Sequence, residues 1–268
     1  MGLAVVIHAD VSVVIPCFNS ASTLERALKS VVDQTLPPHE VIVVDDASTD
    51  DVRSVVDRVR ASKPLFELRL VRRESNHGPS AARNHGWSLA KSSYVAFLDA
   101  DDEWFPSKLE MQFNVMRSRP TLAMSGHRYS ETLTPSVSSR PAPTREIPLG
   151  RLLFRNYFST PSVMIRRDVT TRFRQEWSHA EDYLLWLETV AAYGSALLID
   201  APLVRLHKAA YGASGLSSAM RPMQSGELRA FRQLRRSGAI GRTRLVIALC
   251  WSSLKYVRRI FILRLRGI

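Results

Sequence analysis

Two short apolar runs in the first hundred residues each end in a cluster of carboxylates, and this pattern constrains the fold more than any other feature. Residues 41–44 are followed by an Asp-Asp pair at 45–46, and residues 94–98 are followed by Asp-Ala-Asp-Asp at 99–102. A short apolar run bounded by turn residues predicts a strand that is buried on both faces of a sheet. Because ligands of open parallel sheets bind outside the carboxyl ends of the strands, both clusters should face one site.

The chemistry of such a site follows from its charge. Gathered carboxylates repel a bare phosphate, but they can bind a divalent metal ion that bridges to a phosphate. The sequence therefore predicts metal-assisted chemistry on a nucleoside diphosphate at this edge of the sheet.

Strand and helix patterns alternate from residue 11 to residue 120, which predicts an α/β fold with a parallel, doubly wound sheet. We expect one helix to open with the capping-box spacing of residues 22–25. A second helix should be capped by Asp50 or Asp51 and run to about residue 60.

The second half of the chain is less regular. A helix over 181–193 and a strand over 196–206 are expected there. Residues 132–148 are rich in Pro, Ser and Thr, which predicts a loop and a mobile lid. Residues 209–222 are expected to form a loop of small residues.

Positive charge is concentrated at the C-terminal end. The chain has a net charge of +12, and residues 228–268 carry ten arginines, Lys255 and no acidic residue. The other 26 basic residues nearly balance the 25 acidic ones, so the tail predicts an anionic partner. In projection, residues 241–265 form a basic amphipathic helix, with Arg258 on one side and Leu249 and Val257 on the other. Such a helix either lies in a membrane interface or packs its apolar face on the body.

The sequence also bears on the compartment. Cys17 and Cys250 are the two cysteines and lie far apart, which is no disulfide framework and suits a reducing compartment. The first residues lack the positive region of a signal peptide, and no apolar run approaches the length of a membrane span. We therefore expect a cytoplasmic protein associated with the inner face of the cytoplasmic membrane.

Four ordered motifs resemble those of an inverting family 2 glycosyltransferase with the GT-A fold. The motifs are residues 11–19 with 40–50, an Asn-x-Gly-x-x-x-Ala-Arg-Asn stretch at 76–84, an Asp-x-Asp triplet at 99–101, and a Glu-Asp-x-x-x-Trp pattern at 181–186, followed by Arg-x-His at 205–207. The resemblance implies a GT-A-like (Rossmann-like), mostly parallel sheet flanked by helices, with a basic helical extension. The expected domains are a catalytic domain at 1–222, with a nucleotide-binding half at about 11–120 and an acceptor-side half at 121–222, and a tail at 223–268.

The resemblance implies a donor site at the first two loops, where the nucleotide, commonly uridine, would bind. It places Phe18 beside the base and makes Asp46 the acceptor for the ring N–H of the base. Arg83 would either pair with the acidic loops or reach the diphosphate. The residues expected to bind the donor are Pro16, Phe18, Asn19, Asp46, Arg83, Asp99 and Asp101.

The resemblance also assigns the metal and the acceptor side. A divalent metal ion, manganese or magnesium, would be held by Asp101 and His207 and would bridge the donor diphosphate. Asp182 would be the general base, with Glu181 and Trp186 on the acceptor side. The residues alone leave other roles open, because acids at a helix N-terminus are favoured by the helix dipole and a tryptophan in an apolar stripe is commonly a core residue.

Together these features predict a metal-dependent inverting glycosyltransferase that moves a sugar from a nucleoside-diphosphate sugar, a UDP-sugar by the family's preference, to a hydroxyl acceptor. The acceptor would be a glycan or a lipid-linked glycan of the cell envelope. Two other classes remain open. A nucleotidyltransferase would carry a basic, Gly-rich loop after the first strand, and residues 16–21 contain neither. A non-catalytic module would bind an anionic partner such as nucleic acid through its tail, but the body has no other basic stripe.

Overall fold

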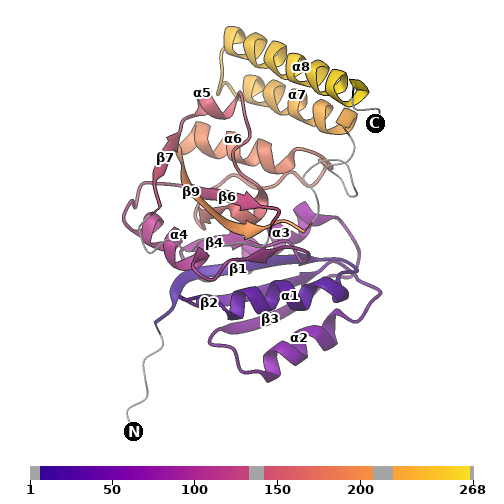
Figure 1. Ribbon diagram of the computed structural model, residues 1–268, viewed down its shortest axis with the longest axis vertical. Coiled ribbons are helices and arrows are strands. Elements are labelled where there is room, and N and C mark those ends of the chain that lie inside the picture. Colours follow the sequence, from indigo (N-terminus) through magenta and orange to yellow (C-terminus); the bar gives the residue numbers. More distant parts are fainter. Residues whose placement is uncertain (1–6, 133–141, 208–219, 266–268) are drawn as a thin grey trace.

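The computed structural model describes residues 7–132, 142–207 and 220–265 (Figure 1). The strands are β1 Ala9–Cys17, β2 Pro38–Asp45, β3 Glu67–Arg72, β4 Tyr94–Phe97, β5 Glu103–Trp104, β6 Met124–Ser130, β7 Thr144–Ile147, β8 Met164–Arg166 and β9 Ala196–Arg205. The helices are α1 Ala21–Val32, α2 Val52–Ala61, α3 Pro79–Leu89, α4 Lys108–Arg117, α5 Leu149–Leu152, the single 3₁₀ turn η1 Thr160–Ser162, α6 Glu181–Tyr193, α7 Met220–Arg236 and α8 Arg242–Leu265.

The strands of the described residues form one mixed sheet in the order β3-β2-β1-β4-β8-β6-β9-β5, and β7 pairs with β9 beside this path. The first four strands of this order run parallel, whereas β8 is antiparallel to both of its neighbours. The expected doubly wound, mostly parallel sheet is therefore confirmed. The chain reverses direction across the sheet at β1, which lies between β2 and β4, and this switch point is where open α/β sheets bind ligands.

Helices cover both faces of the sheet, which is why its central strands are mainly apolar. Val13 of β1 packs with α1, α2 and α4 on one face, and Val14 packs with α3 and α6 on the other. Successive side chains of a strand point to opposite faces, so a run such as residues 11–15 supplies both cores at once. Figure 1 shows α1 and α2 on one side of the sheet and α6, α7 and α8 stacked on the other.

The first helix begins slightly before its expected start, whereas the second is capped by one of its two expected residues. Helix α1 begins at Ala21, one residue before the expected capping box, and the Ala21 N–H donates to Asp50 Oδ2 at 2.7 Å. Helix α2 is capped by Asp51, whose Oδ1 accepts from the Ser54 N–H at 3.1 Å. The Asp50 carboxylate thus accepts a hydrogen bond from the first N–H of a helix that begins 29 residues earlier. Local sequence cannot reveal such a contact.

The sheet contains two strands, β5 and β7, that were not expected. Strand β7 lies inside the segment 132–148, because it can pair along residues 196–199 of the long strand β9. Strand β5 was not expected and pairs with the end of β9. The rest of the expected lid, at 133–141, and most of the loop expected at 209–222 lie outside the described residues.

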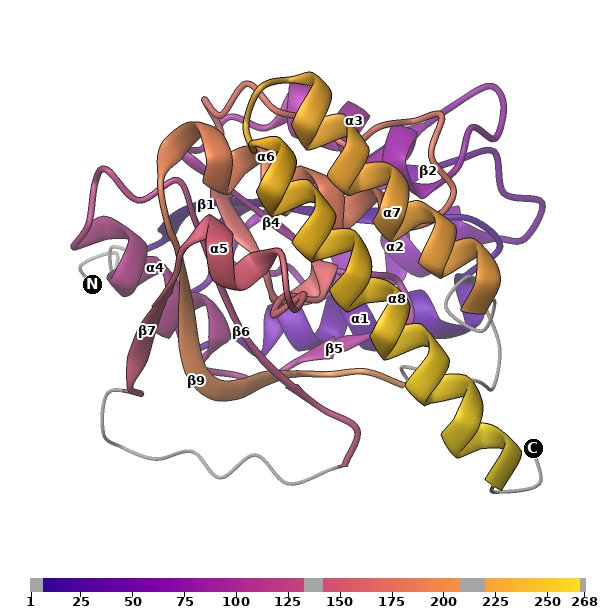
Figure 2. The ribbon, with the colours of Figure 1, turned by 90° about the horizontal axis from the view of Figure 1, so that it is seen from above.

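The two C-terminal helices form an outer layer over α6, as Figures 1 and 2 show. Helix α7 contributes the fully buried Ala230, Phe231 and Leu234 to the core, and α8 lies against α7. The basic extension therefore packs on the body, while the domain boundary at residue 222 stays a prediction. Within the described ranges, no helix combines the length and the apolarity needed to cross a membrane.

Candidate active site

The paired carboxylates after β2 are each held by an arginine from the neighbouring strand end. Asp45 lies opposite Arg72 in the β2–β3 register, and Arg72 Nη1 lies 3.2 Å from Asp45 Oδ2. Arg73 Nη1 lies 2.7 Å from Asp46 Oδ1. These partners resolve the repulsion between adjacent buried carboxylates. Sequence reasoning missed both arginines, although two adjacent basic residues at the end of a short strand-forming segment were an available signal.

Asp46 also connects the second loop to the start of α3. Its Oδ2 accepts from the Gly78 N–H at 2.7 Å and from the His77 N–H at 3.1 Å. The carboxylate is almost completely buried. Asp46 is therefore rigidly held at the carboxyl end of the sheet, which is where the nucleotide base is expected, and its role toward a base stays a prediction.

The three expected donor residues of the first loop occupy different environments. Pro16 is a buried residue of β1, paired with Val44, whereas the ring of Phe18 is 46% exposed just beyond the strand. Asn19 has a left-handed backbone (φ 49°), and its Oδ1 accepts from the Thr49 N–H at 2.8 Å. Asn19 thus joins the first two loops, and Phe18 is the side chain of this set that is exposed for stacking.

Arg83 connects the two halves of the site. Its Nη2 lies 2.7 Å from Asp99 Oδ1, and its Nη1 lies 3.7 Å from Glu181 Oε1. Burial alone would lower the pKa of the guanidinium, but Asp99 and Glu181 outweigh it and raise the pKa above its ordinary value. Of the two roles left open by the sequence, the structure shows the salt bridge to the acidic loop.

Asn84, the residue after Arg83, binds the segment that precedes α6. Asn84 Nδ2 donates to the Phe173 carbonyl at 2.7 Å, and its Oδ1 accepts from the Phe173 N–H at 3.1 Å. The Phe173 ring lies under the Arg83 guanidinium, 5.4 Å away. The Arg-Asn pair of the 76–84 motif therefore fastens the segment before α6 to the donor half of the sheet.

Asp182 lies in the first turn of α6, partly buried beside this junction. Its Oδ1 accepts from the Tyr183 N–H at 2.6 Å, and the Thr160 hydroxyl lies 3.5 Å from Oδ2. Burial, and then the charge of Glu181, raise the pKa of Asp182 from 3.8 to about 7, although Arg83 opposes the shift. A carboxylate with a pKa near 7 is suited to accept a proton at neutral pH.

The other two acceptor-side residues differ in accessibility. Glu181 stays partly buried next to Arg83, whereas Trp186 is fully buried and packs edge-on against Phe173 at 5.9 Å. Because an acceptor cannot contact a fully buried ring, the structure favours the core role for Trp186. The expected acceptor contact at Trp186 is thus corrected: the residue lies on the inward face of α6, and only the first turn of that helix reaches the junction.

The last motif meets the Asp-x-Asp loop. The His207 N–H donates to Asp102 Oδ1 at 3.2 Å, and His207 Nε2 lies 3.0 Å from Glu103 Oε2. This approach follows from the pairing of β5 with the end of β9, which sets Glu103 opposite Arg205. Asp101 lies in the same loop, where its carbonyl accepts from Arg26 at 2.7 Å. Sequence reasoning missed Glu103 as a partner of His207.

The donor set at this loop fits a metal ion shared with a substrate. Among the described residues, no group of three or more His, Cys, Asp or Glu side chains is arranged to hold a metal. Magnesium-type sites commonly use one or two carboxylates together with substrate phosphates. The Glu103 carboxylate accepts from His207 Nε2, which leaves the lone pair on Nδ1, and a carboxylate behind a ligating histidine is a common supporting contact in metal sites.

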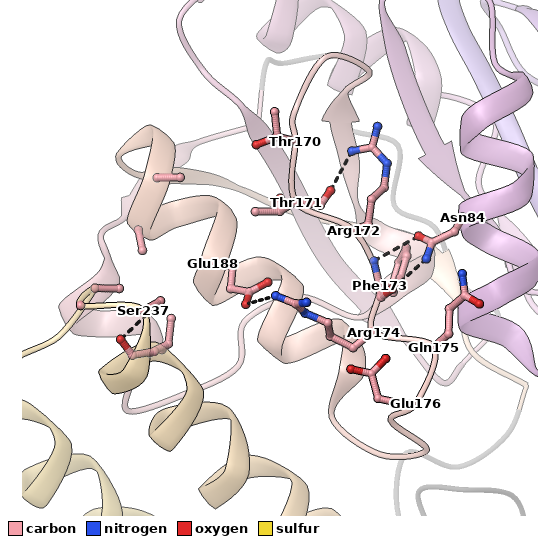
Figure 3. Close-up of a pocket in the computed structure, with 15 residues that line it drawn as sticks. Asn84, Thr170, Thr171, Arg172, Phe173, Arg174, Gln175, Glu176, Glu188 and Ser237 are labelled. Atoms are coloured by element: carbon pink, nitrogen blue, oxygen red, sulfur yellow. Dashed lines mark hydrogen bonds and ion pairs between the residues drawn. The ribbon is translucent and has the colours of Figure 1, made fainter.

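A cavity of about 990 Å³ lies beside Asn84 and the Phe173 segment (Figure 3). It is lined by residues 170–176, the second half of α6 and the turn after α7, and it includes the ion pair of Arg174 with Glu188. None of the acidic residues of the two loops lines it. We place the candidate site at the acidic loops because the titratable groups converge there and at the switch point of the sheet.

The comparisons with known proteins decide the family. The model of glycosyl transferase family 2 matches residues 12–175, which is more than half of the chain. The chain belongs to glycosyl transferase family 2. The match contains Asp46, Arg83 and Asp101 but ends before Asp182 and His207, so the roles of these last two rest on geometry and on the resemblance.

Curated relatives of this glycosyltransferase act in bacterial glycan synthesis. The chain is 31% identical over 177 residues to the Escherichia coli UDP-Glc:alpha-D-GlcNAc-diphosphoundecaprenol beta-1,3-glucosyltransferase WfgD, covering 66% of this chain and 68% of the relative. It is 40% identical over 109 residues to the putative teichuronic acid biosynthesis glycosyltransferase TuaG of Bacillus subtilis, covering 41% of this chain and 42% of the relative.

Solved structures share the fold at lower identity. Residues 1–349 of S. aureus TarS in complex with UDP-GlcNAc match with a TM-score of 0.65 and 23% identity, covering 84% of this chain and 66% of that chain. The mannosyltransferase PcManGT from Pyrobaculum calidifontis, in complex with GDP-Man and Mn²⁺, matches with a TM-score of 0.66 and 19% identity, covering 92% of this chain and 74% of that chain. At these identities the likeness establishes the fold.

Proposed function

We propose that this glycosyltransferase is metal-dependent and inverting, and that it transfers a sugar from a UDP-sugar to a hydroxyl group of a lipid-linked or other envelope glycan. One observation carries the proposal. Arg83 joins Asp99 of the Asp-x-Asp loop to Glu181 at the start of α6, and this places the raised-pKa carboxyl of Asp182 beside the donor half. A base next to a donor loop is what direct displacement requires.

The donor would lie across the ends of β1, β2 and β4. The exposed ring of Phe18 offers a stacking surface for the base, and Asp46 offers a carboxylate that Arg73 and two backbone N–H groups hold in place. Pro16 and Asn19 would shape the loop rather than contact the sugar, because one is buried in β1 and the other binds Thr49. Asp99 would reach the ribose or the sugar.

Asp101 and His207 would hold the metal ion, with Glu103 orienting the imidazole. Bound there, manganese or magnesium would offset the charge that develops on the departing diphosphate. Arg83 lies next to the same loop as a permanent cation that needs no binding step, so it would add to that stabilisation.

Asp182 would act on the acceptor. As the acceptor oxygen attacks the anomeric carbon, its proton passes to the Asp182 carboxylate. The bond between the anomeric carbon and the diphosphate oxygen breaks at the same time, and the electron pair leaves with UDP. Attack opposite the leaving group inverts the configuration at this carbon. The Thr160 hydroxyl and the Tyr183 N–H would orient the carboxylate for this proton transfer.

The relatives support the substrate class. The name of WfgD specifies a UDP-sugar donor and a diphosphoundecaprenol-linked acceptor, and the name of TuaG specifies putative teichuronic acid biosynthesis. A uridine donor and a lipid-linked acceptor are therefore our proposal for this chain, which would work at the cytoplasmic face of a membrane. Family membership argues against the nucleotidyltransferase and non-catalytic alternatives.

A donor screen tests the proposal. Purified protein would be incubated with UDP-, GDP- and dTDP-sugars, with and without Mn²⁺, and release of nucleoside diphosphate would be followed. We expect Mn²⁺-dependent turnover of a UDP-sugar that is lost in Asp101→Asn but kept in Asp57→Asn, a surface carboxylate paired with Arg60 outside the site. UDP binding would be read by thermal shift in the same plate. If no donor is turned over and no donor binds, the proposal is overturned.

A further inference from the structure

An apolar patch covers the outer face of α8. Twelve large apolar side chains are exposed within the described ranges, and seven of them gather here. We call them the α8 apolar face: Phe154, Val246, Ile247, Trp251, Leu254, Val257 and Phe261. Patches of this kind on a folded protein mark a surface that another molecule covers.

The two sides of α8 show that this face is not the one that packs on the body. Ala248 and Ser252 are buried against the rest of the protein, and Leu249 packs on the core. At 100° per residue Ala248 and Ser252 lie about 120° or more from Leu254 and Val257, which are 60% and 61% exposed, whereas Leu249 lies about 80° from Val257. The helix is therefore apolar on both faces. The expected single apolar face with Leu249 and Val257 together is wrong, since Leu249 faces the body and Val257 faces outward.

The patch is anchored in two elements. Phe154, just after α5, contacts the edge of the Trp251 ring at 6.0 Å between centroids. Its carbonyl accepts from Trp251 Nε1 at 3.1 Å and from Lys255 Nζ at 3.2 Å. These bonds hold an exposed tryptophan in one orientation, with its polar edge turned toward the protein and part of its ring outward.

Charge identifies the occupant. Arg244 and Arg258 of α8 are exposed beside the patch, and Arg151 and Arg155 are exposed beside Phe154. No acidic residue follows Glu227 in the sequence. A second copy of the chain docked through this face would bring arginine against arginine, whereas an anionic lipid surface would complement both the apolar and the basic side chains.

We propose that the α8 apolar face docks into the interface of an anionic lipid bilayer, with the helix lying in the plane of the membrane. Trp251 and Phe261 would enter the boundary between headgroups and acyl chains, and Arg244 and Arg258 would contact lipid phosphates. The helix does not have the composition to cross the bilayer, so docking is peripheral.

The position of the patch suits a lipid-linked acceptor. This part of the inference rests on the proposed function. Thr160, whose hydroxyl lies 3.5 Å from the Asp182 carboxylate, is only six residues further along the chain than Phe154 of the patch. Six extended residues span at most about 22 Å, so the base lies within that reach of the membrane interface. A sugar carried on a membrane-bound diphosphate could thus meet Asp182 without leaving the lipid surface.

Sedimentation with vesicles tests the docking. Full-length protein would be mixed with vesicles of phosphatidylglycerol and phosphatidylcholine, or of phosphatidylcholine alone. We expect binding to the anionic vesicles that weakens with salt and falls about tenfold or more in Leu254→Asp, because a buried apolar side chain is lost. Arg258→Gln should weaken binding about fivefold. Leu65→Asp is the matched control: Leu65 is 59% exposed but lies between α2 and β3, and its variant should bind like wild type.

Two further measurements distinguish membrane docking from dimerisation and from a loss of folding. Of the five tryptophans, Trp251 is the exposed one, so vesicles should shift the emission of wild type to the blue but not that of Trp251→Phe. Donor turnover with a soluble acceptor should be unchanged in Leu254→Asp. Equal binding of wild type and Leu254→Asp to anionic vesicles would overturn the docking, and so would a wild-type dimer in sedimentation velocity that Leu254→Asp dissociates. In either case, persisting turnover would leave the proposed function intact.

Discussion

Replacing Asp182 by Asn should inactivate the enzyme and also stabilise its fold at alkaline pH. Burial, helped by Glu181, raises the pKa of Asp182 from 3.8 to about 7. The folded protein therefore binds this proton more tightly than the unfolded chain, in which the pKa is about 3.9. The carboxyl's contribution to stability is then complete below about pH 4 and is lost as the pH rises through about 7.

The size of the effect follows from the shift. About three pKa units at 1.36 kcal/mol per unit correspond to about 4 kcal/mol at pH 8 and to less than about 1 kcal/mol at pH 4. A buried asparagine is never charged, so it does not carry the cost of a buried carboxylate. The substitution also removes an anion near Arg83, which reduces the gain in the free energy of unfolding. We expect Asp182→Asn to raise the free energy of unfolding by about 2–4 kcal/mol at pH 8, and by much less at pH 4.5.

Urea denaturation of wild type and variant at pH 4.5, 6 and 8 measures this difference. Glu188→Gln is the control on the same helix, because the Glu188 carboxylate pairs with Arg174 at 3.0 Å and should cost at most about 1 kcal/mol when removed. A stability gain that does not grow with pH would refute the reasoning about burial. Sugar transfer that survives in Asp182→Asn would refute the assignment of the base.

Three further outcomes are expected. The kcat/KM of wild type should fall as the pH drops below about 7, following protonation of Asp182, and a profile flat from pH 5 to 8 would contradict this. Arg83→Met should move that acid limb to higher pH, since Arg83 lowers the pKa of Asp182, and a pH–rate profile that does not move would count against it. Gly226→Ala should lower stability by about 1–3 kcal/mol and slow transfer, because the new Cβ would lie 2.6 Å from the His179 carbonyl next to α6. Gly150→Ala, with open space at its Cβ, should do neither in thermal melts and transfer assays.

Several elements could be predicted because their signals are local. The apolar runs that became β2 and β4 have no polar face, so they could only be buried strands with helices on both sides. Helix α6 begins and ends where its pattern predicts, with Gly194 following its last residue. The position of Asp46 and Asp101 after strands likewise followed from chain order alone.

Other features depend on register and on distant segments. Adjacent buried carboxylates such as Asp45 and Asp46 need positive partners, and Arg72 and Arg73 supply them only because β3 pairs with β2 in one register. Asp50 reads locally as the cap of the helix that follows it. It caps α1 instead, since the two loops meet at the sheet edge.

The sequence by itself determined the parallel part of the sheet, the acidic loops at the ends of its strands and the charge of the tail, because these follow from short-range periodicity and composition. Only the tertiary structure decided that Arg83 joins Asp99 to Glu181, that the pKa of Asp182 is raised, and that Val257 faces outward while Leu249 faces the body. The reason is physical. Desolvation and Coulomb interactions depend on distances through space, and groups about a hundred residues apart acquire those distances only when the chain has folded.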